Sequence, residues 1–79
     1  MITVLFFGPV AERVGQSRLE IAFQVGMRLQ DLHVQLQTRY PEAFALVSLA
    51  AVNGTHVRDR SVALADKSEV VFMSKFSGG

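Results

Sequence analysis

The sequence predicts an α+β domain in which one main helix packs on a mixed sheet of four to five strands. Two observations support this prediction. Segments that alternate polar and apolar residues, which is typical of strands, flank a single segment of helical period. Glycine, proline and asparagine turn signals separate these segments. The 79 residues suit one small domain, and 49% of them are hydrophobic, which is enough for an apolar core.

The first two strands are separated by a short helical turn. Residues 2–7 are rich in β-branched and aromatic side chains and stop at a Gly-Pro pair. Pro9 suits the first position of a helical turn that extends to Val14. Residues 18–23 alternate polar and apolar side chains, so we expect a second, half-buried strand that ends before Gly26.

The main helix is predicted over residues 28–40. Its stripe of packing residues recurs at helical spacing and consists of Leu29, Leu32, His33, Leu36 and Tyr40. Asp31 suits the positive end of the helix dipole, and Pro41 ends the helix because the residue before a proline avoids the α region. We interpret His33 as a packing residue rather than a metal ligand, since no pair of carboxylates accompanies it.

The remaining strands follow the helix. Residues 49–52 form a compact apolar strand, and the Asn-Gly pair after it predicts a tight turn into a return strand over 55–58. A turn at 66–68 precedes the last strand, 69–73. A right-handed crossover through the helix sets the last strand parallel to the first. This element order is typical of the ubiquitin-like β-grasp fold, so we expect a β-grasp domain over residues 1–73 and a flexible tail over 74–79.

One face of this sheet is expected to carry an apolar patch. If the first and last strands lie side by side in the middle of the sheet, the period of two places Leu5, Phe7, Val71 and Met73 together on the face away from the helix. One helix cannot cover both faces of a sheet, and uncovered apolar patches mark partner surfaces. A covering loop or a homodimer is the alternative interpretation.

Composition excludes several classes of function. The chain has no cysteine, which excludes disulfides, thiolate metal sites and thiol nucleophiles. A net charge of +1 with scattered basic residues gives no reason to expect nucleic acid. No apolar run is long enough to cross a membrane and no signal peptide is recognisable, so we expect a cytoplasmic protein. No catalytic triad, phosphate loop or carboxylate pair appears, which argues against an autonomous enzyme, a bound cofactor or a metal site.

The ending of the chain offers a reactive group. Phe76 and Ser77 lead to Gly78 and Gly79, and glycine can thread a narrow channel because it lacks a Cβ atom. A partner can adenylate the α-carboxylate of Gly79 with ATP, and a sulfur donor can then attack the mixed anhydride to give a thiocarboxylate. Without cysteine, this carboxyl group is the one plausible covalent site for sulfur. Lys75 is either a partner-contacting charge, a site for an isopeptide bond or a solvated side chain.

Several segments together resemble the MoaD/ThiS sulfur-carrier family. They are the residues 4–7, 11–15, 49–54, 64–66 with 69–70, and 77–79. The sequence is most similar to the small subunit of molybdopterin synthase. Two departures are Ser74-Lys75, where family members have a Pro-Pro pair, and Asp66-Lys67-Ser68 in place of an Asp-Gly-Asp turn.

The resemblance implies a non-catalytic, sulfur-donating subunit. An E1-like adenylyltransferase would activate Gly79, and the large subunit of molybdopterin synthase would receive the tail in a heterotetramer. There the thiocarboxylate would donate sulfur to cyclic pyranopterin monophosphate. Two alternatives stay open: a sulfur carrier for thiamin or another pathway, and a ubiquitin-like modifier or interaction domain.

Overall fold

The computed structural model describes residues 1–75. In chain order the elements are β1 (Ile2–Phe6), α1 (Gly8–Val14), β2 (Arg18–Ile21), α2 (Leu29–Arg39), α3 (Pro41–Phe44), β3 (Leu49–Val52), β4 (Thr55–His56) and β5 (Glu69–Met73). The five strands form one sheet in the order β2-β1-β5-β3-β4. β5 therefore lies in the middle of the sheet, although it is the last strand along the chain.

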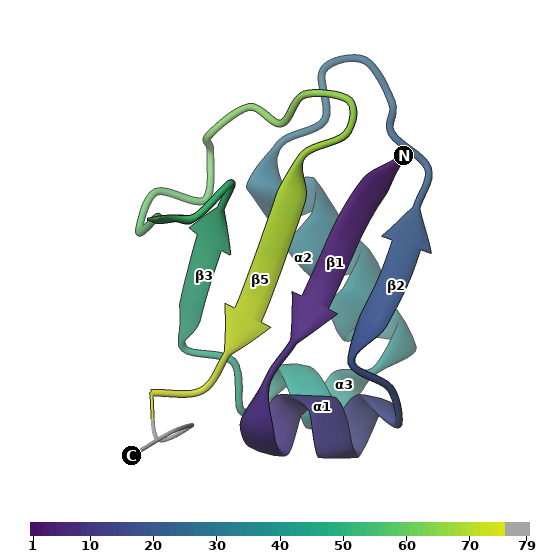
Figure 1. Cartoon of the computed structure of the whole chain (residues 1–79), viewed down its shortest axis with the longest axis vertical. Coiled ribbons are helices and arrows are strands. Elements are labelled where there is room, and N and C mark those ends of the chain that lie inside the picture. Colours follow the sequence, from purple (N-terminus) through teal and green to yellow (C-terminus); the bar gives the residue numbers. More distant parts are fainter. Residues whose placement is uncertain (76–79) are drawn as a thin grey trace.

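The sheet is mixed, and helices cover one of its faces. β1 pairs with β5 in parallel, whereas β1–β2, β3–β5 and β3–β4 are antiparallel. Figure 1 shows α2 crossing behind the sheet, with α1 and α3 at the end where β1 and β5 finish. The face toward the viewer carries no helix. The predicted α+β, ubiquitin-like β-grasp fold, with one main helix on a mixed sheet, is confirmed.

The hydrophobic core lies between the sheet and α2. Alternate strand residues point into it, because successive side chains of a strand face opposite sides. The largest completely buried side chains are Phe6, Phe72, Ile2, Leu29, Leu32, Leu36, Val4, Val10 and Val70. The three leucines belong to the helical stripe expected from the sequence, and the buried strand residues alternate with the residues assigned to the face away from the helix.

Short local signals set the ends of the elements. The Asp31 carboxylate accepts a hydrogen bond of 2.9 Å from the main-chain N–H of Arg28, which satisfies a donor at the start of α2. Gly15 follows α1 with a φ of 91°, and its N–H donates to the carbonyl of Ala11. The β3–β4 turn places Gly54 at a φ of 84°, as an Asn-Gly hairpin turn requires.

Three strands are shorter than the sequence predicts. β1 ends at Phe6 rather than at residue 7. β2 ends at Ile21 rather than at residue 23, because Ile21 pairs with Ile2, the first residue of β1, and no partner strand extends further. β4 ends at His56 rather than at residue 58. The predicted bounds of β3 and β5 are confirmed.

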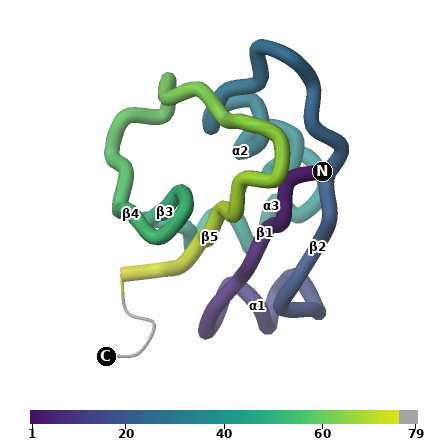
Figure 2. Tube along the Cα trace, turned by 45° about the horizontal axis from the view of Figure 1, so that its top comes forward, coloured from purple at the N-terminus to yellow at the C-terminus, as the bar shows by residue number. Residues whose placement is uncertain are grey.

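The segment between β4 and β5 packs beside the start of α2. Leu64 is buried and its main-chain N–H donates to the carbonyl of Met27, while the N–H of Leu29 donates to the carbonyl of Val62. Figure 2 shows this segment arching past α2 before it enters β5. Within the described residues, the longest helix has 11 residues, and none is long and apolar enough to cross a membrane.

Candidate functional site

The point where the chain leaves β5 is fixed by hydrogen bonds to Ser48, the residue before β3. The main-chain N–H of Ser48 donates to the carbonyl of Met73 at 3.1 Å, and the N–H of Lys75 donates to the Ser48 Oγ at 2.8 Å. Ser74, between them, is buried. The first two residues of the predicted tail therefore contact the domain.

The remaining predicted tail residues lie outside the described residues. These are Phe76, Ser77, Gly78 and Gly79, to which the sequence assigns threading and sulfur chemistry. The structure describes the base from which this segment departs. We call Ser74 and Lys75 the tail base. They directly follow β5, which is hydrogen-bonded on both sides, to β1 and to β3.

The face without a helix carries the apolar residues expected from the strand pattern. In the sheet register Leu5 lies beside Val71, and Met73 lies two residues further along β5. Phe7 follows β1 with extended backbone angles, so its side chain continues the alternation on the side of Leu5. We call this surface, with its neighbours Leu49 and Ala51 on β3, the outer face.

Exposure differs across the outer face. Val71 is only 8% exposed, although it does not belong to the core cluster between sheet and helix. It sits between Leu5 and Ala51 on the neighbouring strands, whose side chains share its face. The expectation of a wholly uncovered patch is therefore wrong at its centre. Leu5 and Met73 are half-buried, and Phe7 is 49% exposed.

The sequence pattern did not identify the residues of β3 that belong to this surface. Leu49 pairs with Met73, and Ala51 pairs with Val71. His56 on β4 lies opposite Ala51 and so shares the same face. The antiparallel register of β3 on β5 is the information needed to find them, and it is a long-range pairing that no local turn sets.

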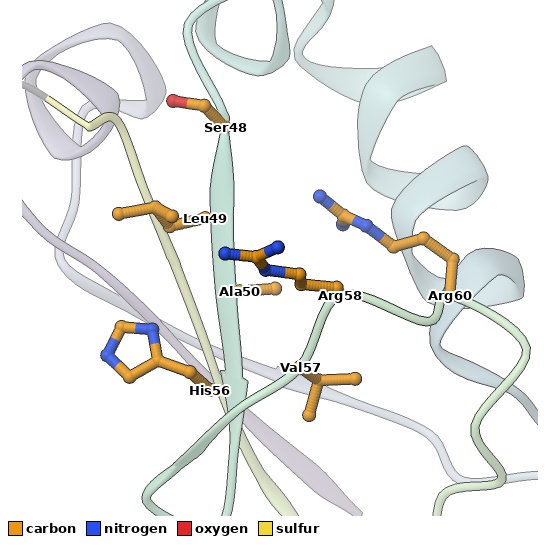
Figure 3. A pocket seen from close by; sticks show the side chains of 7 residues that line it. All are labelled: Ser48, Leu49, Ala50, His56, Val57, Arg58 and Arg60. Atoms are coloured by element: carbon orange, nitrogen blue, oxygen red, sulfur yellow. The ribbon is translucent and has the colours of Figure 1, made fainter.

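A cavity of about 530 Å³ opens at the edge of the sheet next to the outer face. It is lined by Ser48, Leu49, Ala50, His56, Val57, Arg58 and Arg60. Figure 3 shows the Arg58 side chain crossing β3 toward Leu49, and Arg60 lying beside the helix. We call it the edge cavity. Sequence reasoning missed it, because its residues show no periodic pattern and come together only where β4 ends.

His33 lies behind the edge cavity and is neutral there. Arg60 Nη1 donates to His33 Nδ1 at 2.9 Å, and an arginine can only donate, so this nitrogen carries no proton. Burial of the ring, and then the nearby charge of Arg60, lower the pKa of His33 below its ordinary 6.5. The ring packs edge-to-face on Phe44 and Phe72, with centroids at 5.2 and 5.8 Å. These contacts agree with its interpretation as a packing residue.

The described residues offer no arrangement for metal chemistry. Within residues 1–75, no three histidine, aspartate or glutamate side chains gather closely enough to hold a metal ion. The chemical features of this structure are thus an anchored tail base, an apolar outer face and a cavity with two arginines.

Comparison with known proteins places this arrangement in a family. The model of the ThiS family matches residues 4–79. The chain belongs to the ThiS family. The resemblance expected from the sequence is thereby confirmed. Members of this ThiS/MoaD-like group are ubiquitin-fold sulfur carriers or small modifiers, are generally non-catalytic and work with partner proteins. Among curated proteins, none matches this sequence significantly.

Solved structures share the ThiS-family fold of this chain. One is a Pyrococcus furiosus protein provisionally described as molybdopterin converting factor, subunit 1, with a TM-score of 0.82, 23% identity and coverage of 92% of this chain and 94% of that one. Another is SAMP1 of Haloferax volcanii, with a TM-score of 0.82, 18% identity and coverage of 99% and 98%. The small archaeal modifier protein 1 of Methanosarcina acetivorans has a TM-score of 0.79, 18% identity and coverage of 99% and 95%.

Proposed function

We propose that this ThiS-family chain is a sulfur carrier that holds sulfur as a thiocarboxylate on Gly79. The family match is the main support, because it extends from residue 4 through Gly79 and so includes the Ser77-Gly78-Gly79 segment. Composition supports the same site. The sequence has no cysteine, so no side-chain thiol competes with the carboxyl group for sulfur.

The proposed chemistry has two steps at the carboxylate of Gly79. First, a carboxylate oxygen attacks the α-phosphorus of ATP, pyrophosphate leaves, and an acyl adenylate forms on an E1-like adenylyltransferase that binds the ATP. Second, a hydrosulfide-equivalent donor adds to the acyl carbon and AMP leaves, which gives the thiocarboxylate. Gly78 and Gly79 lack Cβ atoms, so the end of the tail passes through a narrow channel, with Ser77 and Phe76 behind it.

The partner proteins are proposed to dock on the outer face beside the tail base. Leu5, Phe7 and Met73 offer accessible apolar surface around the buried Val71. Apolar side chains at the centre of an interface contribute most of the binding free energy. Lys75 is exposed and lies where the tail begins, so it meets any partner that receives the tail.

The acceptor that we propose is cyclic pyranopterin monophosphate, with the chain acting as the small subunit of molybdopterin synthase. The large subunit would take up the tail in a heterotetramer and would supply the catalytic residues. The fold shared with the Pyrococcus furiosus converting-factor protein supports this assignment, as do the Leu-Phe-Phe opening and the Ala-Val-Asn turn of the sequence.

Intact-mass spectrometry tests the carrier function directly. The full chain is incubated with an E1-like enzyme, ATP and a sulfur donor, and we expect the mass to rise by the difference between sulfur and oxygen. Deleting Gly79 is expected to abolish this gain while the melting temperature stays unchanged, because terminal residues contribute little to packing. A Val34→Ala variant, changed at an exposed helix position, serves as the control that still loads. Sulfur loading that survives the deletion would place the site elsewhere.

A second experiment addresses the acceptor. The chain is purified together with its native partners, and a molybdopterin synthase large subunit is expected among them. Co-purification with a thiazole synthase instead would contradict the molybdopterin assignment and favour the thiamin pathway, while leaving the carrier chemistry intact.

A small-modifier function is the second candidate. The fold match to SAMP1 of Haloferax volcanii, which covers nearly all of both chains, favours it. A modifier would use the same acyl adenylate to form an isopeptide bond with a lysine. Conjugates of higher mass that require Gly79 and ATP, but no sulfur donor, distinguish this function from sulfur transfer.

A further inference from the structure

The edge cavity exists because β4 is short. β4 contributes only two residues, which pair with Ala51 and Val52, so the first half of β3 has no neighbouring strand on that side. One more hydrogen bond joins the N–H of Val57 to the carbonyl of Ala50 at 2.9 Å. The chain then turns away from the sheet and carries Arg58 and Arg60 over the opening that it leaves.

The positive charge of this cavity is not neutralised within residues 1–75. Neither Arg58 nor Arg60 makes an ion pair with any carboxylate in that range. The nearest acid along the chain, Asp59, accepts hydrogen bonds from the main-chain N–H and the hydroxyl of Ser61, and these bonds lower its pKa. His33, the neighbour of Arg60, is neutral, as its hydrogen bond requires. The cavity is therefore cationic, and a carboxylate from outside the domain complements it.

Apolar side chains line the rest of the cavity. Leu49, Ala50 and Val57 combine with the two guanidinium groups, so the matching ligand has both a carboxylate and an aliphatic part. A glutamate or aspartate side chain beside aliphatic residues has this composition. Guanidinium groups bind carboxylates with paired, charge-assisted hydrogen bonds, which gives such a contact a defined geometry.

The position of the cavity indicates which molecule supplies this carboxylate and its aliphatic neighbours. Leu49 and His56 line the cavity and also belong to the outer face. Ser48, at the rim, accepts the hydrogen bond from Lys75 at the tail base. A protein that covers the outer face and receives the tail thus extends over the cavity.

We propose that the edge cavity binds an acidic side chain, flanked by aliphatic residues, on the protein partner that docks on the outer face; this rests on the docking part of the proposed function. The contact fixes the partner's orientation at the sheet edge, beside the tail base. Specificity among partners then depends on a carboxylate placed opposite Arg58 and Arg60, because like charges there would repel.

A peptide titration tests this proposal without ATP or sulfur. The ¹⁵N-labelled full chain is titrated with acetyl-Leu-Glu-Leu-Glu-amide and, separately, with the matched peptide in which both glutamates are glutamine. We expect amide shifts to concentrate on residues 48–50 and 56–60, and the glutamate peptide to bind about fivefold more tightly at low salt, as expected for exposed charge pairs. Arg58→Gln is expected to remove this preference, whereas Arg39→Gln, at the exposed end of α2, keeps it.

Three outcomes would overturn the proposal. Equal affinity for both peptides would show that no carboxylate is recognised. A preference for the glutamate peptide that survives in both Arg58→Gln and Arg60→Gln would show that the carboxylate binds outside the edge cavity. Inorganic phosphate that shifts the same amides at lower concentration than the peptide would assign the cavity to a small anion. The titration does not involve the chemistry of Gly79. A negative titration therefore does not contradict sulfur loading, and a failure of sulfur loading does not contradict a positive titration.

Discussion

The His33 side chain links the edge cavity to the hydrophobic core. The Nδ1 atom of the imidazole ring accepts a hydrogen bond from Arg60, and the ring packs edge-to-face with Phe44 and Phe72. Protonation would place a positive charge next to the guanidinium group and would remove the acceptor at Nδ1. The folded state therefore favours neutral His33, which makes stability depend on pH.

This gives a prediction with a definite sign. The pKa of His33 is lower in the folded protein than its ordinary 6.5, so between these two values the unfolded chain binds more protons. Stability is expected to be fully present above pH 6.5 and to fall as the pH drops below it. Urea midpoints measured from pH 7.5 to 5 check this. His33→Gln is expected to flatten the slope, whereas the exposed His56→Gln keeps it; a slope unchanged in His33→Gln would contradict the assignment.

The contacts of individual side chains were only partly predictable from the sequence. The helical stripe identified His33 as a packing residue, because its spacing relative to Leu29 and Leu36 is visible in the sequence. Its partner Arg60 lies 27 residues away in a segment without periodic pattern. The register that brings such residues together depends on the tertiary fold, so periodicity alone did not reveal the pair or the edge cavity.

Among the elements, β5 has the largest structural role. It is bonded to β1 on one side and to β3 on the other. Its residue Phe72 is completely buried and meets the rings of Phe6, Phe44 and His33, with centroid distances of 6.4, 5.0 and 5.8 Å. One side chain of β5 thus joins the sheet to α2 and α3.

Truncating this side chain is expected to be costly. Phe72→Ala should lower the free energy of unfolding by about 3–5 kcal/mol, since it removes buried apolar surface and leaves a cavity. For so small a domain this is a large part of the total stability. Chemical denaturation measures the change, with Val34→Ala as the exposed control, expected to stay within about 0.5 kcal/mol of the original chain. A loss below about 1 kcal/mol in Phe72→Ala would mean that the ring cluster contributes little.

The opposite side of β5 leads to a prediction about partners. Met73 is half-buried on the outer face, so Met73→Ala should change stability modestly and remove surface that a partner buries. We expect the KM for sulfur loading to rise at least about threefold, as for an interface residue, with kcat unchanged. Steady-state loading kinetics check this. If KM stays constant while kcat falls, Met73 acts on the reacting tail rather than on docking.

At the level of elements, turn signals were the most informative part of the sequence. The Asn-Gly pair and the turn before Glu69 gave β3 and β5 their correct bounds. β2 and β4 came out shorter than predicted, because a strand ends where its neighbour offers no further partner. The last paired residue depends on the length and register of the neighbouring strand, and the polar–apolar alternation within β2 or β4 carries no information about that neighbour.

For the whole molecule, the predictable part was the layer arrangement. One main helix between strands, a last strand parallel to the first and one face without a helix followed from element order and the right-handed crossover. The accessibility of the outer face was harder to predict. Val71 lies at its centre and is shielded by Leu5 and Ala51 on the two neighbouring strands. The sequence pattern had not assigned Ala51 to any face.

The central place of β5 also has a consequence for quality control. β1 and β3 meet only through β5, so the outer face and the tail base are complete only when the final strand lies between them. An unfolded or truncated chain has neither, even if its last residues are intact. A partner that recognises this surface would therefore leave immature chains uncharged, and no separate checkpoint would be needed to keep reactive sulfur off misfolded protein.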